Sequence, residues 1–404
     1  MNAAPALTRL ALFGALALGA CAPKVPPPAP TPAPPPVEKL ALEAVRFADL
    51  PGWAEDRHDD ALAAFVVSCR RIAAMPATQG LGGGGIAGSA GDWTDVCQAA
   101  NRAGGDARRF FETHFVPFRA SNDGKAEGLF TGYYEPELRG SRRPTARYAV
   151  PLYKRPNDLV TVDLGQFRES LRGQTIAGKV AGGALQPYDN RGRIEAGALR
   201  GKNLELVWVD DPVDAFFLQV QGSGRVVLED GQIMRVGYAA QNGHGYIAIG
   251  RVLRDRGLLD PADISLQTIR AWLRANPGQA AAMMNENPSF VFFREIAGEG
   301  PLGAQGVALT PGRSLAVDRT HHALGVPVWL VASHPSADPS RPDVALRRLV
   351  IAQDTGGAIR GPVRGDVFWG HGRDAEEIAG RMKHQGVFFL LLPKGVADKR
   401  RATS

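Results

Sequence analysis

The stretch that decides the fold is LVIAQDTGGAIRGPVRGDVFWGHG, which spans residues 349–372. Its apolar beginning predicts a buried strand that ends at Asp354, and a glycine turn containing Gly357 follows. A polar loop then leads to Asp366, which opens a second predicted strand ending in Trp369. Both acids therefore lie at strand ends beside glycines, which let a ligand approach the backbone closely.

The two acids allow two interpretations. Asp is common in turns because its carboxylate bonds nearby backbone N–H groups, and this explains either residue taken alone. The two acids together, beside Trp369, favour a site instead. A carboxylate next to an aromatic strand and glycine loops suits acid chemistry on a sugar, so Asp354 and Asp366 are the candidate catalytic residues.

The composition is that of a globular protein. With 404 residues the chain is long enough for two domains, and 44% hydrophobic with 22% charged residues is an ordinary balance. The net charge is +6, but no basic run alternates with aromatic residues as in a nucleic-acid groove. We therefore expect no nucleic-acid partner, and the positive charge either fits an anionic partner such as a wall polymer or has no particular meaning.

The first 21 residues predict a targeting segment. Arg9 precedes the apolar run of residues 10–20, which is too short to span a bilayer. The run ends in LGAC, which resembles a bacterial lipobox and makes Cys21 the expected lipidation site; a plain secretory peptide is the alternative. Ala22 stands where an Asp often signals inner-membrane retention. We therefore expect a lipid anchor on the periplasmic face of the outer membrane.

A proline-rich spacer follows the anchor. Residues 22–36 contain nine prolines, so this segment cannot pack and is expected to extend at about 3 Å per residue. At that spacing it would hold a folded body roughly 40 Å from a membrane.

Cysteine and histidine residues indicate no metal centre. Cys69 and Cys97 are the remaining cysteines, and export permits a disulfide between them. Both also lie in apolar-periodic sequence where a buried free thiol is common, so both possibilities stay open. Since no Cys/His cluster has metal-ligand spacing, we expect no metal or other cofactor, and structural roles for four histidines: His244, His321, His322 and His371.

Hydrophobic periodicity divides the folded part into a helical beginning and two β-rich regions. Helical spacing predicts helices over residues 56–75, 93–103 and 107–115. From residue 128 to about 240 the pattern predicts mostly strands, including 204–209, 215–220 and a hairpin at residues 225–236 around an Asp-Gly turn. Two helices, ending near Gly257 and before Asn276, and a strand at 289–294 follow.

The C-terminal third predicts a compact barrel. Strands are expected at residues 326–331, 346–351, 367–369 and 387–392, between glycine turns. One helix is expected among them, with Asp374 as N-cap, Glu377 completing a capping box, and Gly386 ending it.

Six motifs between roughly residues 125 and 395 resemble the membrane-bound lytic transglycosylase A family. In chain order they are GLFTGYYEPEL, FFLQVQGSGRV, NGHGYIAIGRVL, NENPSFVFF, LTPGRSLAVDR and QDTGGAIRGPVRGDVFWG. Asp318, Asp354 and Asp366 match the three aspartates that name the family's C-terminal 3D domain. The resemblance implies a mainly β fold with flanking helices, in which a double-psi β-barrel formed by both ends of the chain carries an inserted β domain, with a glycan groove between them. The expected divisions are a signal peptide (1–21), a linker (22–40), the barrel (41–139 and 296–404) and the insert (140–295).

The family's reaction needs little catalytic machinery. The resemblance implies a peptidoglycan lytic exotransglycosylase that cleaves the β-1,4 bond between N-acetylmuramic acid and N-acetylglucosamine and leaves 1,6-anhydromuramoyl ends. Ordinary glycosidases use two carboxylates, but here the substrate's own C6 hydroxyl attacks, so Asp366 can act first as acid and then as base. Asp354 would keep Asp366 protonated through its charge or a hydrogen bond. Asp318 is expected to be structural, in an ion pair.

The resemblance also suggests residues that bind the glycan. Gln219 and Gln221 lie two apart in a predicted strand and would face one side. The other expected contacts are Thr131, Tyr134, Ser223, Asn242, Gly357 and Trp369. For each polar residue an ordinary surface or core role is the alternative, and that alternative is favoured for Asn242 and Thr131.

Three other functions compete with the transglycosylase. A non-catalytic glycan-binding barrel lipoprotein is the main alternative, although the two acids and the groove motifs argue against it. Asp354-Thr355-Gly356 imitates an aspartic-protease turn, but such an enzyme needs a second one. A hydrolase with water as acceptor has the same residues. The sequence leaves open exo against endo cleavage, peptide-stem preference, and other cell-wall enzymes as partners.

Overall fold

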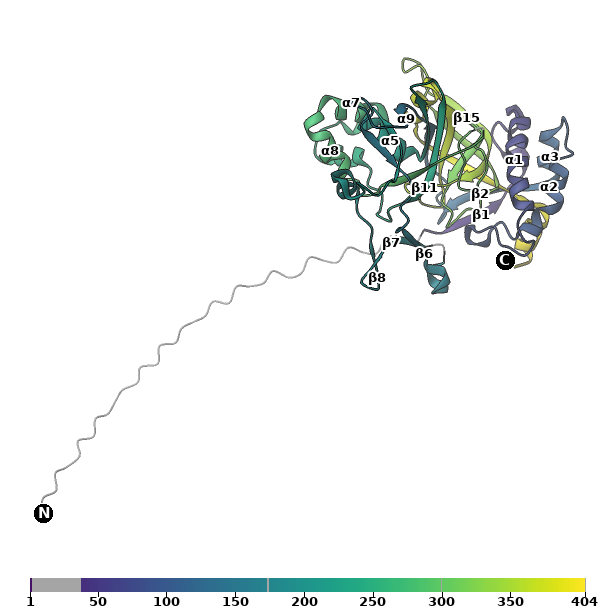
Figure 1. The fold of residues 1–404 in the computed structure, drawn as a ribbon. Helices are drawn as coiled ribbons and strands as arrows, with labels where there is room; N and C mark the ends of the chain where they lie inside the picture. Colours follow the sequence, from purple (N-terminus) through teal and green to yellow (C-terminus); the bar gives the residue numbers. More distant parts are fainter. Residues whose placement is uncertain (2–37, 173, 299, 404) are drawn as a thin grey trace. The chain divides into compact units, whose positions relative to one another are not determined.

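The computed structural model describes residue 1 and residues 38–172, 174–298 and 300–403, and Glu38–Ser404 form one compact unit (Figure 1). The predicted signal peptide, its lipidation site Cys21 and the linker up to residue 37 lie outside the described residues. No helix within the described ranges combines the length and the apolar character needed to cross a membrane.

A closed barrel of six strands stands at the centre of the described unit. Its strands run in the order β17-β14-β15-β13-β16-β3, and β3 pairs back onto β17. Two pairs are parallel, β13 with β15 and β16 with β3, whereas the others are antiparallel. The strands are β3 (Gly128–Glu135), β13 (Ser314–Val317), β14 (Pro327–His334), β15 (Val344–Asp354), β16 (Arg364–His371) and β17 (Lys383–Pro393). The predicted barrel built from both ends of the chain is confirmed.

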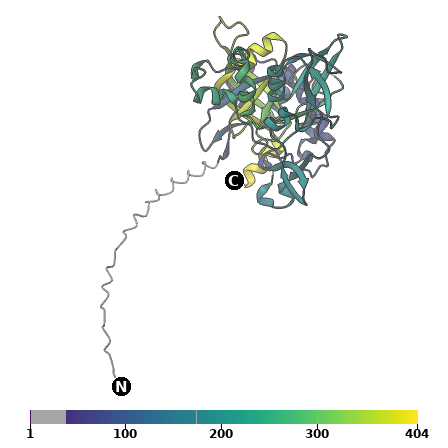
Figure 2. The ribbon, with the colours of Figure 1, turned by 60° about the vertical axis from the view of Figure 1, so that its left-hand side comes forward.

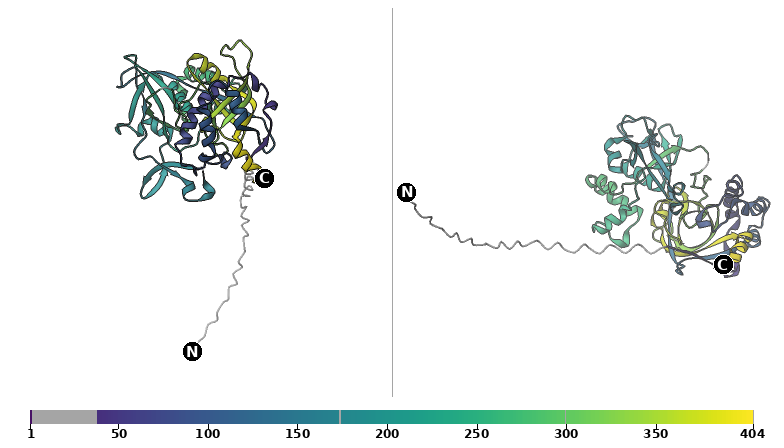
Figure 3. Two further views of the ribbon diagram at one scale, coloured as in Figure 1. Left: turned by 90° about the vertical axis from the view of Figure 1, so that its right-hand side faces the viewer. Right: turned by 90° about the horizontal axis from the view of Figure 1, so that it is seen from below.

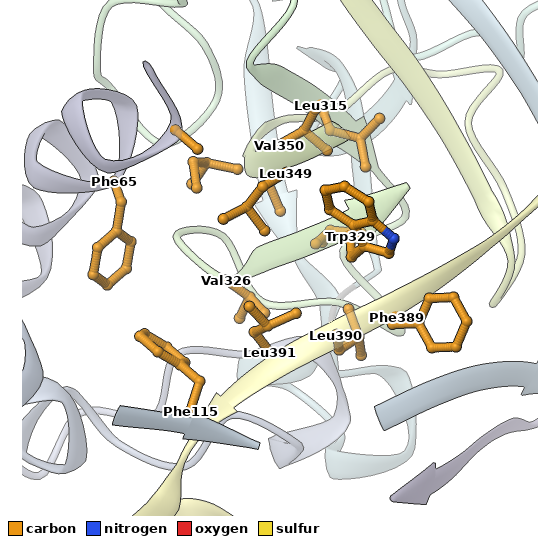
Figure 4. Packing of buried hydrophobic residues seen from close by; sticks show 14 of the residues in the cluster. Phe65, Phe115, Leu315, Val326, Trp329, Leu349, Val350, Phe389, Leu390 and Leu391 are labelled. Carbon is orange, nitrogen blue, oxygen red and sulfur yellow. The ribbon is translucent and has the colours of Figure 1, made fainter. Parts of the chain in front are cut away.

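The N-terminal helices pack on the outside of this barrel. α1 (His58–Ala73), α2 (Thr94–Ala100) and α3 (Ala107–His114) follow the predicted helices closely. Figure 4 shows Phe65 of α1 facing a cluster of barrel side chains that includes Leu349 and Trp329. Because β15 is covered by α1 on one side and by the barrel interior on the other, its central residues form a continuous apolar run instead of an alternating one.

Further elements extend the barrel domain. β1 (Leu40–Ala44) and β2 (Phe115–Asn122) add two antiparallel strands beside β17, and α10 (Lys394–Thr403) follows β17. Cys69 and Cys97 form a disulfide with Cα atoms 5.2 Å apart, which joins α1 to α2. Of the two possibilities for these cysteines, the structure has the bridge.

The inserted domain contains two sheets. The larger has the order β12-β11-β10-β4-β9-β5, and its β10–β11 hairpin is the one predicted around Asp230-Gly231. The smaller has the order β6-β7-β8. The strands are β4 (Glu137–Ser141), β5 (Val150–Tyr153), β6 (Val160–Asp163), β7 (Thr175–Ala181), β8 (Ala184–Pro187), β9 (Glu205–Val209), β10 (Ser223–Leu228), β11 (Ile233–Gln241) and β12 (Val291–Glu295).

Helices complete the insert: α4 (Arg191–Arg193), α5 (Pro212–Gln221), α6 (Ile249–Asp255), α7 (Leu266–Ala275) and α8 (Pro277–Asn285). The view from below in Figure 3 shows barrel strands in yellow between the green insert helices and the purple helices α1–α3. Figure 2 shows the same ribbon turned by 60° about the vertical axis.

Two element predictions are wrong. Residues 215–220 belong to helix α5, because Asp211 accepts hydrogen bonds from the N–H groups of Val213 and Asp214, and Pro212 occupies the first turn. The apolar run hid this start signal, since short apolar runs fit strand and helix alike.

The second wrong prediction concerns α9 (Arg373–Arg381). Asp374 lies inside its first turn instead of capping it, and Glu377 pairs with Arg381 at 3.6 Å. The helix ends at Arg381, and Gly386 lies within β17. A Cβ on Gly386 would approach the carbonyl oxygen of Val331 to 2.7 Å, so this glycine serves close strand packing and not a helix end.

A buried ion pair fastens α1 to the barrel. The guanidinium of Arg313, just before β13, donates to both carboxylate oxygens of Asp56 at 2.8 and 3.0 Å, and each side chain is 6% exposed. Asp56 also accepts the backbone N–H of Leu349 in β15 at 2.8 Å. One carboxylate therefore holds two barrel strands and the chain entering α1.

Replacing Arg313 with Met tests this fastening. The change leaves the Asp56 charge buried without its partner, so we expect a loss of about 3–5 kcal/mol in the free energy of unfolding, measured with denaturant. The matched control is Arg46→Met, which removes the exposed Arg46–Asp49 pair and should leave the midpoint unchanged. Equal, small effects of the two changes would contradict the assigned role.

Candidate active site

Asp366 lies on β16 with a hydrogen-bonded chain of side chains on one side. Its register partner on β3 is Thr131, whose hydroxyl donates to Asp366 Oδ1 at 2.6 Å. Arg364, two residues earlier on β16, donates from Nη2 to the same hydroxyl oxygen at 2.9 Å. The guanidinium is itself held by the backbone oxygens of Leu129 and Gly365.

The hydrogen bonds from Arg364 to Thr131 and from Thr131 to Asp366 determine which oxygen of Asp366 can carry a proton. Arg364 can only donate, so the single proton of the Thr131 hydroxyl points at Asp366 Oδ1. When Asp366 is protonated, its proton is therefore on Oδ2, the oxygen left for a ligand. Burial raises the pKa of Asp366, while the charge of Arg364 and the Thr131 hydrogen bond act in the opposite direction.

Asp354 ends β15 and is the second carboxyl of the site. Oδ1 accepts the backbone N–H groups of Ala304 and Thr355, both at 2.8 Å, and Oδ2 accepts the phenol of Tyr133 at 2.9 Å. Burial raises the pKa of Asp354 to about 6, against these hydrogen bonds, and the charge of Asp366 adds to the rise. The two carboxyls therefore interact electrostatically.

Tyr133 is a site residue that the sequence analysis missed. It is buried, and its ring lies 5.2 Å from that of Phe368 between centroids. Burial and the charge of Asp354 raise its pKa, so it remains a neutral hydrogen-bond donor. Its position two residues after Thr131 on β3, and therefore on the same face, was the available signal.

Trp369 does not lie beside the acids, contrary to the argument from sequence adjacency. Asp366 and Phe368 share one face of β16, whereas Trp369 points to the other. There its ring packs 4.6 Å from that of His334, and Arg348 lies over it at 5.8 Å. Phe368, and not Trp369, supplies the apolar surroundings near Tyr133.

Tyr134 and Gln221 hold the insert against the barrel, whereas Gln219 bonds within the insert. The buried Tyr134 phenol donates to Glu376 of α9 at 3.1 Å and accepts from Arg270 of α7 at 3.2 Å, while its backbone N–H donates to Gln221. Gln219 is buried and accepts from Arg191 at 2.8 Å. Since α5 is a helix, residues two apart point about 200° apart, so Gln219 and Gln221 do not share a face as predicted.

Asn242 and Ser223 are also enclosed in the insert. Asn242 is completely buried, and its amide donates to the backbone oxygens of Asp189 and Pro288 and accepts from the N–H of Phe290. Ser223 is buried at the start of β10. These contacts fit the ordinary core role that was favoured for Asn242.

Gly357 and Tyr246 mark where the insert approaches the acids. Gly357 is exposed in the loop after Asp354, and a Cβ placed on it would lie 3.8 Å from the Cβ of Tyr246. Desolvation of the phenol, with a contribution from the charge of Asp366, raises the pKa of Tyr246, although the residue as a whole is 37% exposed. Tyr246 belongs to the motif NGHGYIAIG, but the sequence analysis did not single it out.

Asp318 stabilises the loop that leads to Asp366. It is buried and accepts hydrogen bonds from the backbone N–H groups of Thr320 and Gly361 and from the Thr320 hydroxyl. Burial acts to raise its pKa, but these bonds outweigh it and lower the pKa overall. Its ion-pair partner, at 3.9 Å, is Arg360.

Comparison with known proteins decides the family. The MltA specific insert domain family matches residues 129–294, and the 3D domain family matches residues 313–392. A crystal structure of a membrane-bound lytic murein transglycosylase from Agrobacterium tumefaciens aligns with a TM-score of 0.78 and 37% identity, covering 89% of this chain and 99% of that one. The chain belongs to the membrane-bound lytic murein transglycosylase A family.

Two further members of the family show how far the similarity extends. Membrane-bound lytic murein transglycosylase A of Vibrio cholerae is 32% identical over 266 residues. The match covers 65%, just under two thirds, of this chain and of that protein. Escherichia coli MltA with bound chitohexaose aligns with a TM-score of 0.63 and 27% identity, covering 87% of this chain and 94% of that one. The family predicted from the six motifs is confirmed, and so is its class of enzyme, a peptidoglycan lytic transglycosylase.

The hydrogen-bonded chain at Asp366 predicts how its pKa responds to substitution. Thr131→Val and Arg364→Met should each raise the pKa of the Asp366 carboxyl, because each removes an interaction that favours the ionised form. Thr131→Ser keeps the hydroxyl and should restore the original value. Carboxyl carbon NMR of the ¹³C-labelled protein measures this, with Asp366→Asn used to assign the signal. Arg360→Met is the control, because Arg360 lies in the loop just before β16 and pairs with Asp318. If the Asp366 pKa in Arg364→Met is no higher than in this control, the assigned role of Arg364 is wrong.

Proposed function

We propose that this chain cleaves the β-1,4 bond between N-acetylmuramic acid and N-acetylglucosamine in peptidoglycan and leaves 1,6-anhydromuramoyl ends. The observation that carries the proposal is Asp366 itself, a half-buried carboxyl with a raised pKa whose proton is directed to Oδ2 by Thr131 and Arg364. Membership of the transglycosylase family and the chitohexaose bound by the Escherichia coli relative support a glycan as the substrate.

In the first step Asp366 acts as a general acid. The Oδ2 proton passes to the glycosidic oxygen, the bond from C1 of the muramic acid to that oxygen breaks, and its electron pair stays on the leaving oxygen. Positive charge develops on the sugar ring, and the carboxylate now formed at Asp366 lies next to it. Asp354, whose pKa is about 6, is largely ionised at neutral pH and adds negative charge nearby.

In the second step the same residue acts as a base. The Asp366 carboxylate takes the proton of the C6 hydroxyl while the C6 oxygen bonds to C1, which closes the anhydro ring and returns Asp366 to its protonated form. No water is consumed, and one carboxyl serves both steps. Asp354, held by the Tyr133 phenol, is coupled to Asp366 by charge, so an ionised Asp354 disfavours the ionisation of Asp366.

Asp366→Asn is the sharpest test of this mechanism. The amide has nearly the same shape but can neither give nor take the proton, so release of anhydromuropeptides from purified sacculi should fall by at least about 10²–10⁴-fold. Binding to sacculi and the unfolding midpoint should stay near the parent values. Mass spectrometry of the products separates anhydro ends from reducing ends, and a variant that keeps near-parent release would exclude Asp366 as the acid.

Asp354→Asn should behave differently. The charge of Asp366 raises the pKa of Asp354, and because this coupling is reciprocal, removing the Asp354 charge should lower the pKa of Asp366. The rate then falls at a lower pH on the alkaline side, while the maximal rate declines less than in Asp366→Asn. An aspartic protease would give the reverse ranking, a hydrolase would yield reducing ends, and a binding protein would yield no products from the parent.

We also propose that Cys21 carries a lipid anchor to the periplasmic face of the outer membrane, on the evidence of the LGAC sequence and the proline spacer. The membrane-bound names of the relatives support this placement. Cys21→Ala should move most of the protein from the membrane fraction to the soluble periplasmic fraction, with activity on sacculi unchanged in vitro. Stable anchoring needs more than one acyl chain, so we expect Cys21 to carry several. A Cys21→Ala variant that stays fully with membranes would count against lipidation.

A further inference from the structure

The three-stranded sheet of the insert has an apolar face and a mixed face. Its antiparallel register pairs Val162 with Ile176 and Val180 with Leu185, and directly paired residues point to the same side. Alternation along the strands then gathers on that side Val160, Val162, Ile176, Val180, Leu185 and Pro187. We call this group the aliphatic face.

The aliphatic face points to solvent. Val180 is 62% exposed and Ile176 is 45% exposed, and Val160 and Leu185 are exposed as well. The opposite face is attached to the body of the insert, where Ala177 packs against the cluster containing Tyr188 and Lys179 pairs with Asp189 at 2.8 Å. An antiparallel sheet with one solvated face normally turns its polar side outward, so this orientation is reversed.

The connection between β6 and β7 adds to the apolar surface of this sheet. Phe167 is 74% exposed there and is followed by the exposed Arg168. Figure 1 shows β6, β7 and β8 projecting at the lower end of the folded unit. An exposed aliphatic group beside an aromatic and a basic residue is typical of a protein surface that meets a membrane interface.

The size and chemistry of the aliphatic face disfavour two other occupants. The exposed apolar area is on the order of several hundred Å², smaller than the roughly 1,200 Å² or more that a stable interface between two copies buries in total. A glycan strand would need hydrogen-bonding groups for its hydroxyls, and the aliphatic face carries none of its own.

The length of chain before the folded unit favours the membrane as the partner of the aliphatic face. Only 18 residues separate the proposed lipid-anchor site Cys21 from β1, which begins at Leu40. Even fully extended at about 3 Å per residue, they keep the unit within roughly 60 Å of the bilayer. Such a tether gives an effective surface concentration at which a weak apolar contact is occupied.

We propose that the aliphatic face of β6–β8, together with Phe167, binds the phospholipid surface to which the chain is anchored. The contact holds the insert against the membrane and so restricts how the folded unit can turn about its tether. The proposal depends on the lipid anchor but not on the chemistry assigned to Asp366.

The test uses the unlipidated chain beginning at Ala22, which contains the whole compact unit, and vesicles of phosphatidylethanolamine with a minor share of phosphatidylglycerol. With lipid in large excess a measurable fraction of the parent should sediment with the vesicles, because the contact is weak without the lipid anchor. A triple variant, Phe167→Ser with Ile176→Thr and Val180→Thr, should bind at least about tenfold more weakly, because it loses apolar groups that partition into the interface. Threonine keeps the β-branched shape, so the sheet should still form.

The matched control is Val344→Thr, which changes a 46% exposed valine on β15 in the barrel and should leave vesicle binding unchanged. Release of muropeptides from sacculi, equal in all variants, reports that the fold is intact, and near-ultraviolet circular dichroism does so if the proposed activity is absent. A parent that does not bind vesicles, a triple variant that binds like the control, or a parent whose aliphatic face instead produces concentration-dependent dimers in sedimentation would each overturn the proposal.

Discussion

The parallel pairing of β3 with β16 is the constraint on which the site depends. It places Thr131 directly opposite Asp366 and, since β3 also pairs with β17, closes the barrel in the same step. A Cβ on Gly128, at the start of β3, would overlap the carbonyl of Val363, so the closure requires glycine there. Strand pairing and catalytic geometry are thus one arrangement, and a shift of β3 by one residue would turn Thr131 and Tyr133 away from both acids.

The insert reaches this site through a charged network at the end of β3. Arg270 of α7 pairs with Glu376 of α9 and donates to Tyr134, and Gln267 donates to the backbone oxygen of Glu376. Tyr246, also from the insert, lies next to the loop that carries Gly357. Tyr134, which was expected to bind glycan, secures the insert against the barrel near the acids, and its contact with a glycan stays a prediction.

Ionising two neighbouring carboxyls near apolar side chains is unfavourable, and the proposed mechanism depends on this. Burial raises the pKa of both Asp354 and Asp366, and each interaction that opposes the rise comes from a defined donor. Asp318 shows the contrast within the same fold, because hydrogen bonds outweigh burial there and it stays ionised. Asp318 and Asp354 each accept three hydrogen bonds, but Asp318 lies near the opposite charge of Arg360 and Asp354 near the like charge of Asp366, so the same residue type serves as a stabilising anion or as a proton carrier.

Sequence by itself determined the elements whose signals are local. The apolar run before Asp354, the helical spacing of α1 and the Asp-Gly hairpin each depend on near neighbours in the chain, and the six motifs identified the family and the pair of acids. Tertiary structure alone decided what depends on partners distant in sequence. Arg364 and Thr131 orient Asp366 only because β3 and β16 pair, Trp369 faces away from the acids despite its adjacency to them, and Cys69 meets Cys97 only once α1 and α2 pack. Strand alternation and hydrogen-bond partners are set by register and burial, which no local pattern encodes.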